Sequence, residues 1–278
     1  HYTSIENIHK VIDPLFLDGL KAELEEIKEI AVEKTRVSRL KAYQSKLAGL
    51  TFLDPACGSG NFLTESYISL RRLENDALRY QTNQITMGDY ANPIQVSIHQ
   101  FYGIEINDFA ATVAKTALWI AESQMLKETE DIIAHQIDFL PLKSYANITE
   151  GNALRLNWED VVPKEKLDYI MGNPPFAGIR SALVSTNSVS QGESVANLWK
   201  PLFEAGVHID YAYRTFRWDS EAKIKAHVHC VIIGFSIAPN HAGKILYFGD
   251  RAQIVQNING YLLDADDVFV ESRNKPLC

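Results

Sequence analysis

The chain has 278 residues, of which 46% are hydrophobic, and it carries a formal net charge of −8. This length fits one large α/β domain with an attached helical segment, and no apolar stretch approaches the roughly 20 residues of a membrane helix or resembles a signal peptide. Taken alone, the acidic balance argues against a nucleic-acid partner, because phosphate contacts normally come from lysine and arginine.

The first 48 residues predict a helical segment. Ser4 is a candidate N-cap for a first helix, which Pro14 must interrupt or restart. A second helix is predicted by apolar residues at helical spacing with charged residues on the remaining faces. These apolar residues are Leu17, Leu20, Leu24, Ile27 and Ala31.

A glycine-rich turn follows a predicted strand at 50–53. The sequence of residues 52–62, FLDPACGSGNF, predicts a strand that ends in a Gly-x-Gly turn and leads into a helix over 62–78. Glycine allows the backbone to turn tightly and to approach a ligand, and the start of the helix offers free N–H groups. Such turns also serve packing alone, so this loop does not by itself identify a ligand.

A second strand is predicted to end in an acidic residue, in the sequence Tyr102-Gly103-Ile104-Glu105-Ile106-Asn107. A carboxylate at this place can accept hydrogen bonds from both hydroxyls of a ribose. The alternative is a carboxylate at the start of a helix, where the helix dipole favours it. The separation from Gly60 exceeds the roughly 20 residues of a dinucleotide fingerprint, so an extra helix or insert is expected within 71–99. The next helix is predicted over 109–125.

The tetrapeptide Asn173-Pro174-Pro175-Phe176 follows the apolar run 169–171. The Asn173 side-chain oxygen and the Pro174 carbonyl can both accept hydrogen bonds from one exocyclic NH2 group, while the Phe176 ring covers the flat face of a base. Asn-Pro and Pro-Pro are also ordinary turn signals, so the tetrapeptide acquires a functional interpretation only together with the glycine-rich loop.

The chain then passes directly into a predicted strand at 182–185. A parallel crossover needs roughly 10 to 12 residues, and the direct join is shorter than that. We therefore expect residues to be missing from the sequence between about Ile179 and Ala182, comprising a helix and a mobile loop. The first residue is His1, and the end at 275–278 completes no element, so we also expect an internal part of a longer protein.

The last third predicts a helix over 193–205 and strands at 209–213, 227–235 and 244–248. Apolar strands that alternate with helices predict a mostly parallel, doubly wound sheet, and the final strands predict an antiparallel hairpin end. His227 and His229 share one strand face without a third ligand, and the three cysteines are widely spaced, so we expect no metal site. We expect reduced thiols and a cytoplasmic protein without a membrane partner.

The glycine-rich loop at 54–60, followed more than 100 residues later by Asn173-Pro174-Pro175-Phe176, resembles the S-adenosylmethionine loop and catalytic loop of adenine-N6 DNA methyltransferases with the gamma motif order. The segments 184–188, 191–193, 216–223 and 267–273 are similar to the MmeI-like (type IIG/IIL) restriction-modification enzymes. In that family one polypeptide joins a nuclease, a methyltransferase and a target-recognition domain. The resemblance implies a class I S-adenosylmethionine-dependent methyltransferase fold over 49–278, with double-stranded DNA and the other two domains as partners outside this chain.

The resemblance also implies roles for individual residues. Asn173, Pro174, Pro175 and Phe176 would be catalytic, and Tyr213 or Phe216 would add a second aromatic contact to the target base. The cofactor contacts would come, besides Asn173, from Tyr2, Thr3, Asp54, Pro55, Ala56, Gly58, Gly60, Asn61, Phe62, Glu105, Ile106, Asn152 and Ala153. Asn152 replaces the family's more usual aspartate, and an amide can still donate and accept at an adenine edge.

The implied reaction is direct methyl transfer from the sulfonium of S-adenosylmethionine to adenine N6, with the adenine flipped out of the duplex. Alternatives are a protein glutamine methyltransferase, a ribosomal RNA methyltransferase, and a non-catalytic S-adenosylmethionine-sensing module of a restriction complex. A local group of Arg214, Arg217, Lys223 and Lys225 would reconcile DNA binding with the negative net charge.

Overall fold

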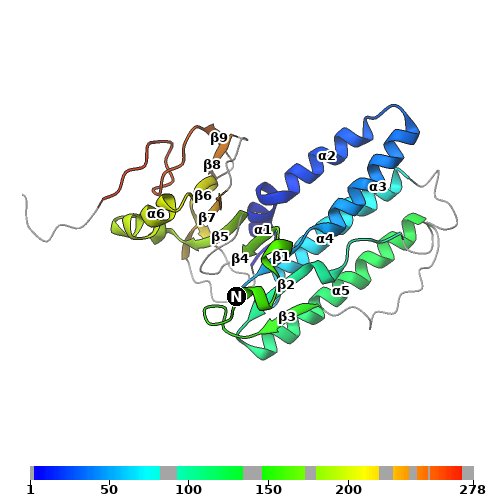
Figure 1. Cartoon of the computed structure of the whole chain (residues 1–278), viewed down its shortest axis with the longest axis horizontal. Coiled ribbons are helices and arrows are strands. Elements are labelled where there is room, and N and C mark those ends of the chain that lie inside the picture. Colours follow the sequence, from blue (N-terminus) through cyan, green and yellow to red (C-terminus); the bar gives the residue numbers. More distant parts are fainter. Residues whose placement is uncertain are drawn as a thin grey trace, which may run out of the picture. The chain divides into compact units, whose positions relative to one another are not determined.

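The computed structural model describes residues 3–81, 93–133, 146–172, 180–218, 228–237, 243–249 and 251–270. The chain forms two compact units, shown in Figure 1. The first unit comprises residues 12–175, and the second unit comprises residues 1–11 with residues 176–278. Each unit has its own strands and its own buried core, and each is described by itself.

Helices dominate the N-terminal part, as the sequence predicts. α1 (Ile5–Ile12), a π-helical turn (Asp13–Leu17), α2 (Asp18–Lys28) and α3 (Glu33–Gly49) follow one another. Ser4 caps α1, because its Oγ accepts a hydrogen bond from the Asn7 backbone N–H at 3.4 Å. The expected interruption at Pro14 takes the form of the π-helical turn, since proline cannot donate the backbone hydrogen bond of a regular helix.

The first unit contains a parallel sheet with the strand order β3-β2-β1-β4. The strands are β1 (Phe52–Asp54), β2 (Phe101–Glu105), β3 (Asn147–Glu150) and β4 (Tyr169–Gly172). The long helices α4 (Asn61–Arg79) and α5 (Asp108–Ile133) connect β1 to β2 and β2 to β3. Helices α2 to α5 lie next to one another in Figure 1.

The two faces of this sheet bury different side chains. On one face, aromatic rings stack, with the Phe52 and Phe101 centroids 5.0 Å apart and Tyr67 of α4 meeting Phe101 edge-on. On the other face, Leu53 and Ile104 pack in an aliphatic cluster under the loop 151–168, which contains two short 3-10 helices, Trp158–Asp160 and Lys164–Lys166. Both faces are therefore covered, as the doubly wound prediction requires.

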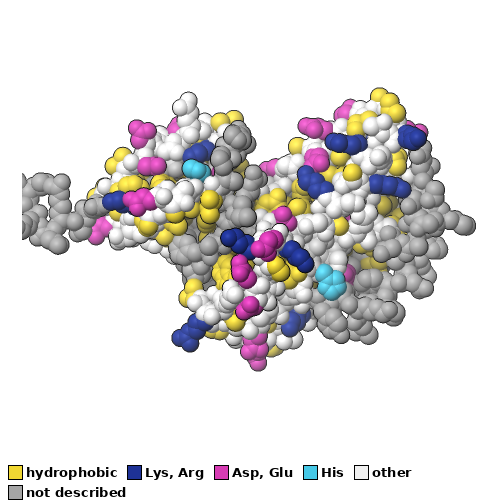
Figure 2. Space-filling view, viewed as in Figure 1, with side chains coloured by type: hydrophobic (Ala, Val, Ile, Leu, Met, Phe, Trp, Pro, Cys, Tyr) yellow, Lys and Arg dark blue, Asp and Glu magenta, His cyan; other side chains and the backbone are white. Residues whose placement is uncertain are grey.

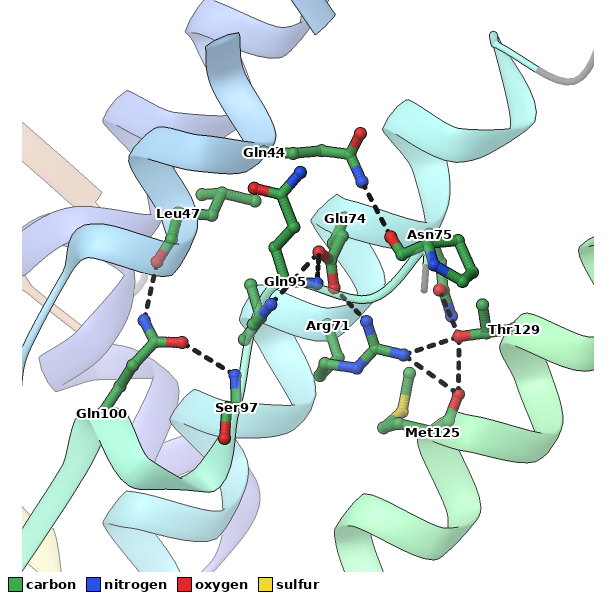
Figure 3. A network of polar contacts seen from close by, with 12 residues as sticks. Gln44, Leu47, Arg71, Glu74, Asn75, Gln95, Ser97, Gln100, Met125 and Thr129 are labelled. Atoms are coloured by element: carbon green, nitrogen blue, oxygen red, sulfur yellow. Dashed lines mark hydrogen bonds and ion pairs between the residues drawn. The ribbon is translucent and has the colours of Figure 1, made fainter. Parts of the chain in front are cut away.

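A buried polar network joins α4 to α5 and to the segment that enters β2 (Figure 3). Arg71 and Glu74 are fully buried and form an ion pair. The Arg71 guanidinium donates to Thr129 Oγ1 at 2.6 Å, and Glu74 Oε1 accepts the backbone N–H groups of Gln95 at 2.6 Å and Val96 at 3.2 Å. Burial raises the pKa of Glu74, and the Arg71 charge opposes that shift. The network thereby fixes the chain just before β2.

The second unit contains the strand order β5-β7-β6-β8-β9. These strands are β5 (Arg180–Thr186), β6 (His208–Trp218), β7 (Val228–Ser236), β8 (Lys244–Phe248) and β9 (Arg251–Val255). β7 is antiparallel to β5 and β6, β6 is parallel to β8, and β9 is antiparallel to β8. α6 (Glu193–Glu204) packs Val195 and Trp199 into the core of this unit.

The class I methyltransferase fold expected from the sequence is confirmed, with parallel strands first and antiparallel pairing in the later part. The sequence analysis did not identify β3 or β9, which are short and have exposed residues. The expected break near 179–182 adjoins residues 173–179, which lie outside the described residues; from Arg180 onward β5 pairs with β7 in unbroken register. None of the helices in the described ranges has the length and apolar character of a membrane span.

We expect Glu74→Gln to lower the free energy of unfolding by about 3–5 kcal/mol, because the Arg71 charge would remain buried without its counter-charge. Chemical denaturation measures this loss. The matched control is Arg79→Ala, which removes a solvent-exposed ion pair with Asp76 and should cost no more than about 1 kcal/mol. Equal stability of wild type and Glu74→Gln would contradict a structural role for the buried pair.

Candidate functional site

The glycine-rich loop leaves β1 at Asp54 and reaches α4 through a tight turn. The Cys57 N–H donates to the Ile104 carbonyl at 3.0 Å, and the Gly60 N–H donates to the Cys57 carbonyl at 2.8 Å. Gly60 has a φ of 82°, and a Cβ atom there would lie 2.9 Å from Ala114 Cβ on α5. Gly58 has a φ of 54°, and the space where its Cβ would stand is open. Gly60 therefore serves close packing, whereas Gly58 leaves its backbone open to a ligand.

Glu105, the last residue of β2, holds this loop. Its Oε2 accepts the Gly58 N–H at 2.8 Å, and its Oε1 accepts the Asn107 N–H at 2.9 Å. Asn107 in turn caps α5, because its Oδ1 accepts the Ala110 N–H at 2.9 Å. A carboxylate oxygen can accept more than one hydrogen bond, and Glu105 is only half-buried, so both oxygens remain able to accept from a ligand hydroxyl.

Asp54 lies beneath the loop with 1% of its surface exposed. Its Oδ1 accepts the Ala56 N–H at 3.0 Å. Burial raises the pKa of Asp54 to about 7, the hydrogen bond from Ala56 opposes the shift, and the charge of Glu105 adds to it. A Cβ atom on Gly172, the residue before Asn173, would lie 2.4 Å from Asp54 Oδ1. The carboxyl group thus packs directly against the backbone that enters the tetrapeptide.

The loop after β3 approaches Glu105 from the other side. The Gly151 N–H donates to the Glu105 carbonyl at 2.8 Å, and Asn152 Oδ1 accepts the Leu154 N–H at 2.9 Å. The Trp158 indole donates to the Ala153 carbonyl at 2.7 Å and holds the loop against the sheet. Two large apolar side chains project from these loops, since Ile106 is 68% exposed and Leu154 is 72% exposed. The sequence analysis named Asn152 and Ala153 of this loop as cofactor contacts and assigned no contact to Leu154.

The structure brings together most of the residues expected at the cofactor. Pro55 and Ala56 lie in the turn, and Asn61 Oδ1 accepts a hydrogen bond from the Ser59 hydroxyl at 3.2 Å. Phe62 lies in the first turn of α4 with 6% exposure, so its ring supports the loop from within the core. Thr3 belongs to the second unit, which is described by itself. The tetrapeptide that the sequence analysis expects to be catalytic (Asn173, Pro174, Pro175 and Phe176) and Tyr2 lie outside the described residues.

Cys57 is buried in the same turn, with 6% exposure. Burial raises the pKa of its thiol, and the neighbouring carboxylates of Asp54 and Glu105 raise it further. The reactive thiolate is therefore disfavoured at neutral pH, and the geometry gives Cys57 a packing role. Its sulfur would lie 2.8 Å from a Cβ placed on Gly103, which shows how closely β2 approaches the turn.

Tyr213 and Phe216, the two candidates for contact with a base, lie on β6 in the second unit. A β-bulge separates them, because the register with β7 shifts between these two positions. The Tyr213 ring stacks on Tyr247 with centroids 4.1 Å apart, and the Lys10 ammonium lies 5.2 Å from the Phe216 centroid. Both rings are half-buried, so each combines a packing role with an accessible edge.

The described residues contain no group of three or more histidine, cysteine, aspartate or glutamate side chains that could hold a metal ion. Of the expected basic group, Arg214 and Arg217 lie on β6, whereas Lys223 and Lys225 lie outside the described residues, as does His227. Figure 2 shows basic and acidic side chains interspersed over the face in view, without a broad patch of one sign.

Comparison with known proteins gives a consistent result. Residues 28–182 and 178–248 match the model of the MmeI DNA-methyltransferase domain. DNA methyltransferase A of Bacillus subtilis (strain 168) is 36% identical over 323 aligned residues, which cover 100% of this chain and 36% of that protein. The solved structure of the type IIL restriction-modification enzyme MmeI in complex with DNA is 38% identical with a TM-score of 0.90, and the match covers 100% of this chain and 43% of that chain. The chain thus spans less than half of either relative.

The raised pKa of Asp54 predicts a pH dependence of stability. The folded state binds the proton more tightly than the unfolded state, whose carboxyl pKa is near 3.8. The resulting stabilisation is complete below that value and is lost as the pH rises through about 7. Between about pH 5 and about pH 8 we expect the unfolding free energy of wild type to fall relative to Asp54→Asn by up to about 3 kcal/mol.

Denaturant titrations over this pH range measure the difference. Asp160→Asn changes an exposed carboxyl group in the same unit and should follow the pH dependence of wild type. Parallel pH profiles for wild type and Asp54→Asn would show that the buried carboxyl does not take up a proton in this range.

Proposed function

The chain belongs to the family of MmeI DNA-methyltransferase domains, and on that premise we propose that it transfers a methyl group from S-adenosylmethionine to N6 of an adenine in double-stranded DNA. The observation that carries the proposal is the Glu105 carboxylate, which is fixed between the Gly58 and Asn107 N–H groups at the end of a parallel strand. Ligands of open α/β sheets bind at the carboxyl ends of such strands.

The described loops fit the proposed cofactor. Glu105 would accept hydrogen bonds from the ribose hydroxyls, and the Asn152 amide would meet the adenine edge. Ile106 and Leu154 offer exposed apolar surface to the flat adenine ring. The open space at Gly58 allows the methionine portion to approach the loop backbone. Bound S-adenosylmethionine would supply an electrophilic methyl group on its sulfonium.

The chemistry would depend on the tetrapeptide that follows β4. The Asn173 amide oxygen and the Pro174 carbonyl would accept hydrogen bonds from the adenine NH2 group, orienting the amine toward the methyl group. Phe176 would stack on the flipped base, and Tyr213 or Phe216 would supply a second aromatic contact. Asp54 would act as a support, because its carboxyl group packs against Gly172 at the start of this loop.

We also propose that the natural protein has further residues next to the tetrapeptide, together with nuclease and target-recognition domains beyond this chain. The two family matches meet at 178–182, and the alignment with the Bacillus subtilis relative is 323 residues long although this chain has 278. A segment inserted there would give the chain enough length for a parallel crossover after β4. Modification of DNA in a restriction-modification system would place the protein in the cytoplasm.

Asn173→Ala should leave S-adenosylmethionine binding intact and lower the rate of adenine methylation by about 10²–10³-fold, because one acceptor for the reacting amine is removed. Calorimetry and radiolabelled methyl transfer to duplex DNA, made on the whole enzyme, measure the two effects. An unchanged methylation rate would contradict the catalytic role of Asn173. Methyl transfer by wild type to protein or ribosomal RNA but not to DNA would favour the alternative substrates, and cofactor binding without any transfer would indicate a sensing module.

Glu105→Gln should weaken S-adenosylmethionine binding by about 10–100-fold, since hydrogen bonds to a charged group contribute about 1.5–3 kcal/mol. Glu150→Gln is the matched control, because Glu150 ends β3 directly beside Glu105 in the parallel register but holds no loop. Calorimetry gives the affinities, and thermal unfolding shows whether either variant loosens the fold. Similar affinities for the two variants would remove Glu105 from the proposed cofactor site.

A further inference from the structure

The second unit contains a cavity of about 330 Å³ that the proposed reaction does not use. Its lining consists of Ser190–Gly192, Arg214, Thr215 and Tyr261–Leu263. β5 and β6 run in the same direction, since both are antiparallel to β7. Ser190 follows the carboxyl end of β5, and Arg214 and Thr215 lie toward the carboxyl end of β6. The cavity therefore opens at the edge where ligands of α/β sheets bind.

The walls of the cavity are fixed by buried polar contacts. The Asn259 side chain is 3% exposed, and its Oδ1 accepts the N–H groups of Tyr261 at 3.0 Å and Leu263 at 3.1 Å. On the opposite wall, the Trp199 indole donates to the Val189 carbonyl at 2.9 Å. The two walls meet where the Tyr261 hydroxyl donates to the Gly192 carbonyl at 3.4 Å. The cavity is thus preformed and does not require a ligand to order it.

Backbone strain is concentrated in the same wall. Leu262 has a φ of 57°, the only positive φ at a non-glycine residue within the described ranges, and its side chain is 1% exposed. A bulky residue in this conformation is strained, because its Cβ crowds the backbone. Burial of the Leu262 side chain in the core of the second unit offsets that strain. A strained loop that is held in place by its core is typical of a ligand site.

The bulge in β6 brings the positively charged Arg214 to the cavity. Between Tyr213 and Phe216 the strand has one residue more than β7, and bulges of this kind redirect side chains beside binding sites. Arg214 is the one lining residue with a formal charge. Its guanidinium lies 5.3 Å from the Phe248 centroid, and it forms no ion pair within the part of the chain that the structure describes. The carboxylate of Asp264, next to this wall, accepts a hydrogen bond from the Asn257 N–H at 3.4 Å.

From this geometry we propose that the cavity binds the sugar-phosphate of one nucleotide of the DNA substrate, with the phosphate on Arg214 and the sugar against Tyr261 and Leu263. The proposal rests on the proposed function for its DNA substrate. A volume of about 330 Å³ suits one nucleotide. The exposed Thr215 hydroxyl adds a hydrogen-bond donor for the phosphate, and the space beside Gly192 is open. This contact would position the strand without reading its sequence.

The test is the salt dependence of DNA binding by the whole enzyme, measured by fluorescence anisotropy with a target and a non-target duplex. Arg214→Met keeps an unbranched aliphatic side chain but removes the guanidinium, with its charge and its contact to the Phe248 ring. We expect the slope of log K against log salt to become shallower by about 0.9, and affinity at about 0.1 M salt to fall about eightfold on both duplexes. Arg214→Lys should restore most of the slope.

Arg251→Met is the matched control, because Arg251 is an exposed arginine on β9 of the same unit and lies outside the cavity lining. It should leave the slope unchanged. An unchanged slope in Arg214→Met, or an equal change in Arg251→Met, would overturn the proposal. Binding of free deoxyadenosine monophosphate or inorganic phosphate at Arg214 without an effect on the DNA slope would assign the cavity to a free ligand instead, which also overturns it.

The result of the salt-dependence experiment can be distinguished from the result of the methylation assays. An enzyme that does not methylate adenine but shows the Arg214-dependent slope would refute the proposed function and support the DNA contact. An enzyme that methylates adenine but has the same salt slope in wild type and Arg214→Met would support the proposed function and refute the DNA contact. Failure of the wild type to bind either duplex would refute both.

Discussion

The arrangement of the candidate site depends on one carboxylate that is bonded to two backbone amides. Glu105 holds Gly58 of the glycine-rich loop and Asn107 at the start of α5, while its own carbonyl accepts the N–H of Gly151. Three loops that follow three parallel strands thereby meet at one residue. Because these bonds use the backbone of each loop, they fix loop positions whichever side chains the loops carry.

The opposite end of β2 is fixed by a different kind of interaction. Arg71 forms a buried ion pair with Glu74 within α4 and donates to Thr129 of α5, and Glu74 accepts two backbone N–H groups just before the strand begins. A buried ion pair is a costly way to gain stability, and Arg71 Nε has no hydrogen-bond partner among the described residues, but the bonds that the pair does make permit few alternative arrangements. The strand that carries Glu105 is therefore anchored at both ends, which suits a residue that must meet a ligand at a defined place.

The two units contribute different elements to the proposed reaction. The first unit would supply loops for the cofactor, and it has a buried carboxyl group beneath the residue that leads into the tetrapeptide. The second unit would supply aromatic rings on β6, and outside the reaction itself it contains a preformed cavity lined by a single charged residue. The negative net charge is compatible with DNA as the substrate if contacts to phosphate are few and local, and Arg214 is placed for such a contact.

The sequence by itself determined the fold class, the glycine-rich loop, the acidic end of β2 and the family resemblance, because glycine positions, apolar periodicity and short motifs are local properties of a chain. It also correctly indicated the helices that begin near Asn61 and Glu193. It did not identify β3 and β9, whose exposed residues give little apolar pattern.

Only the tertiary structure decided which side chains meet. The role of Gly60 against Ala114, the contact of Asp54 with Gly172 and the burial that raises the pKa of Asp54 all join residues far apart in the sequence. The same holds for the cavity beside Arg214, whose walls come from three separate segments of the chain. Distances across a fold depend on how strands pair and helices pack, and no local pattern encodes them.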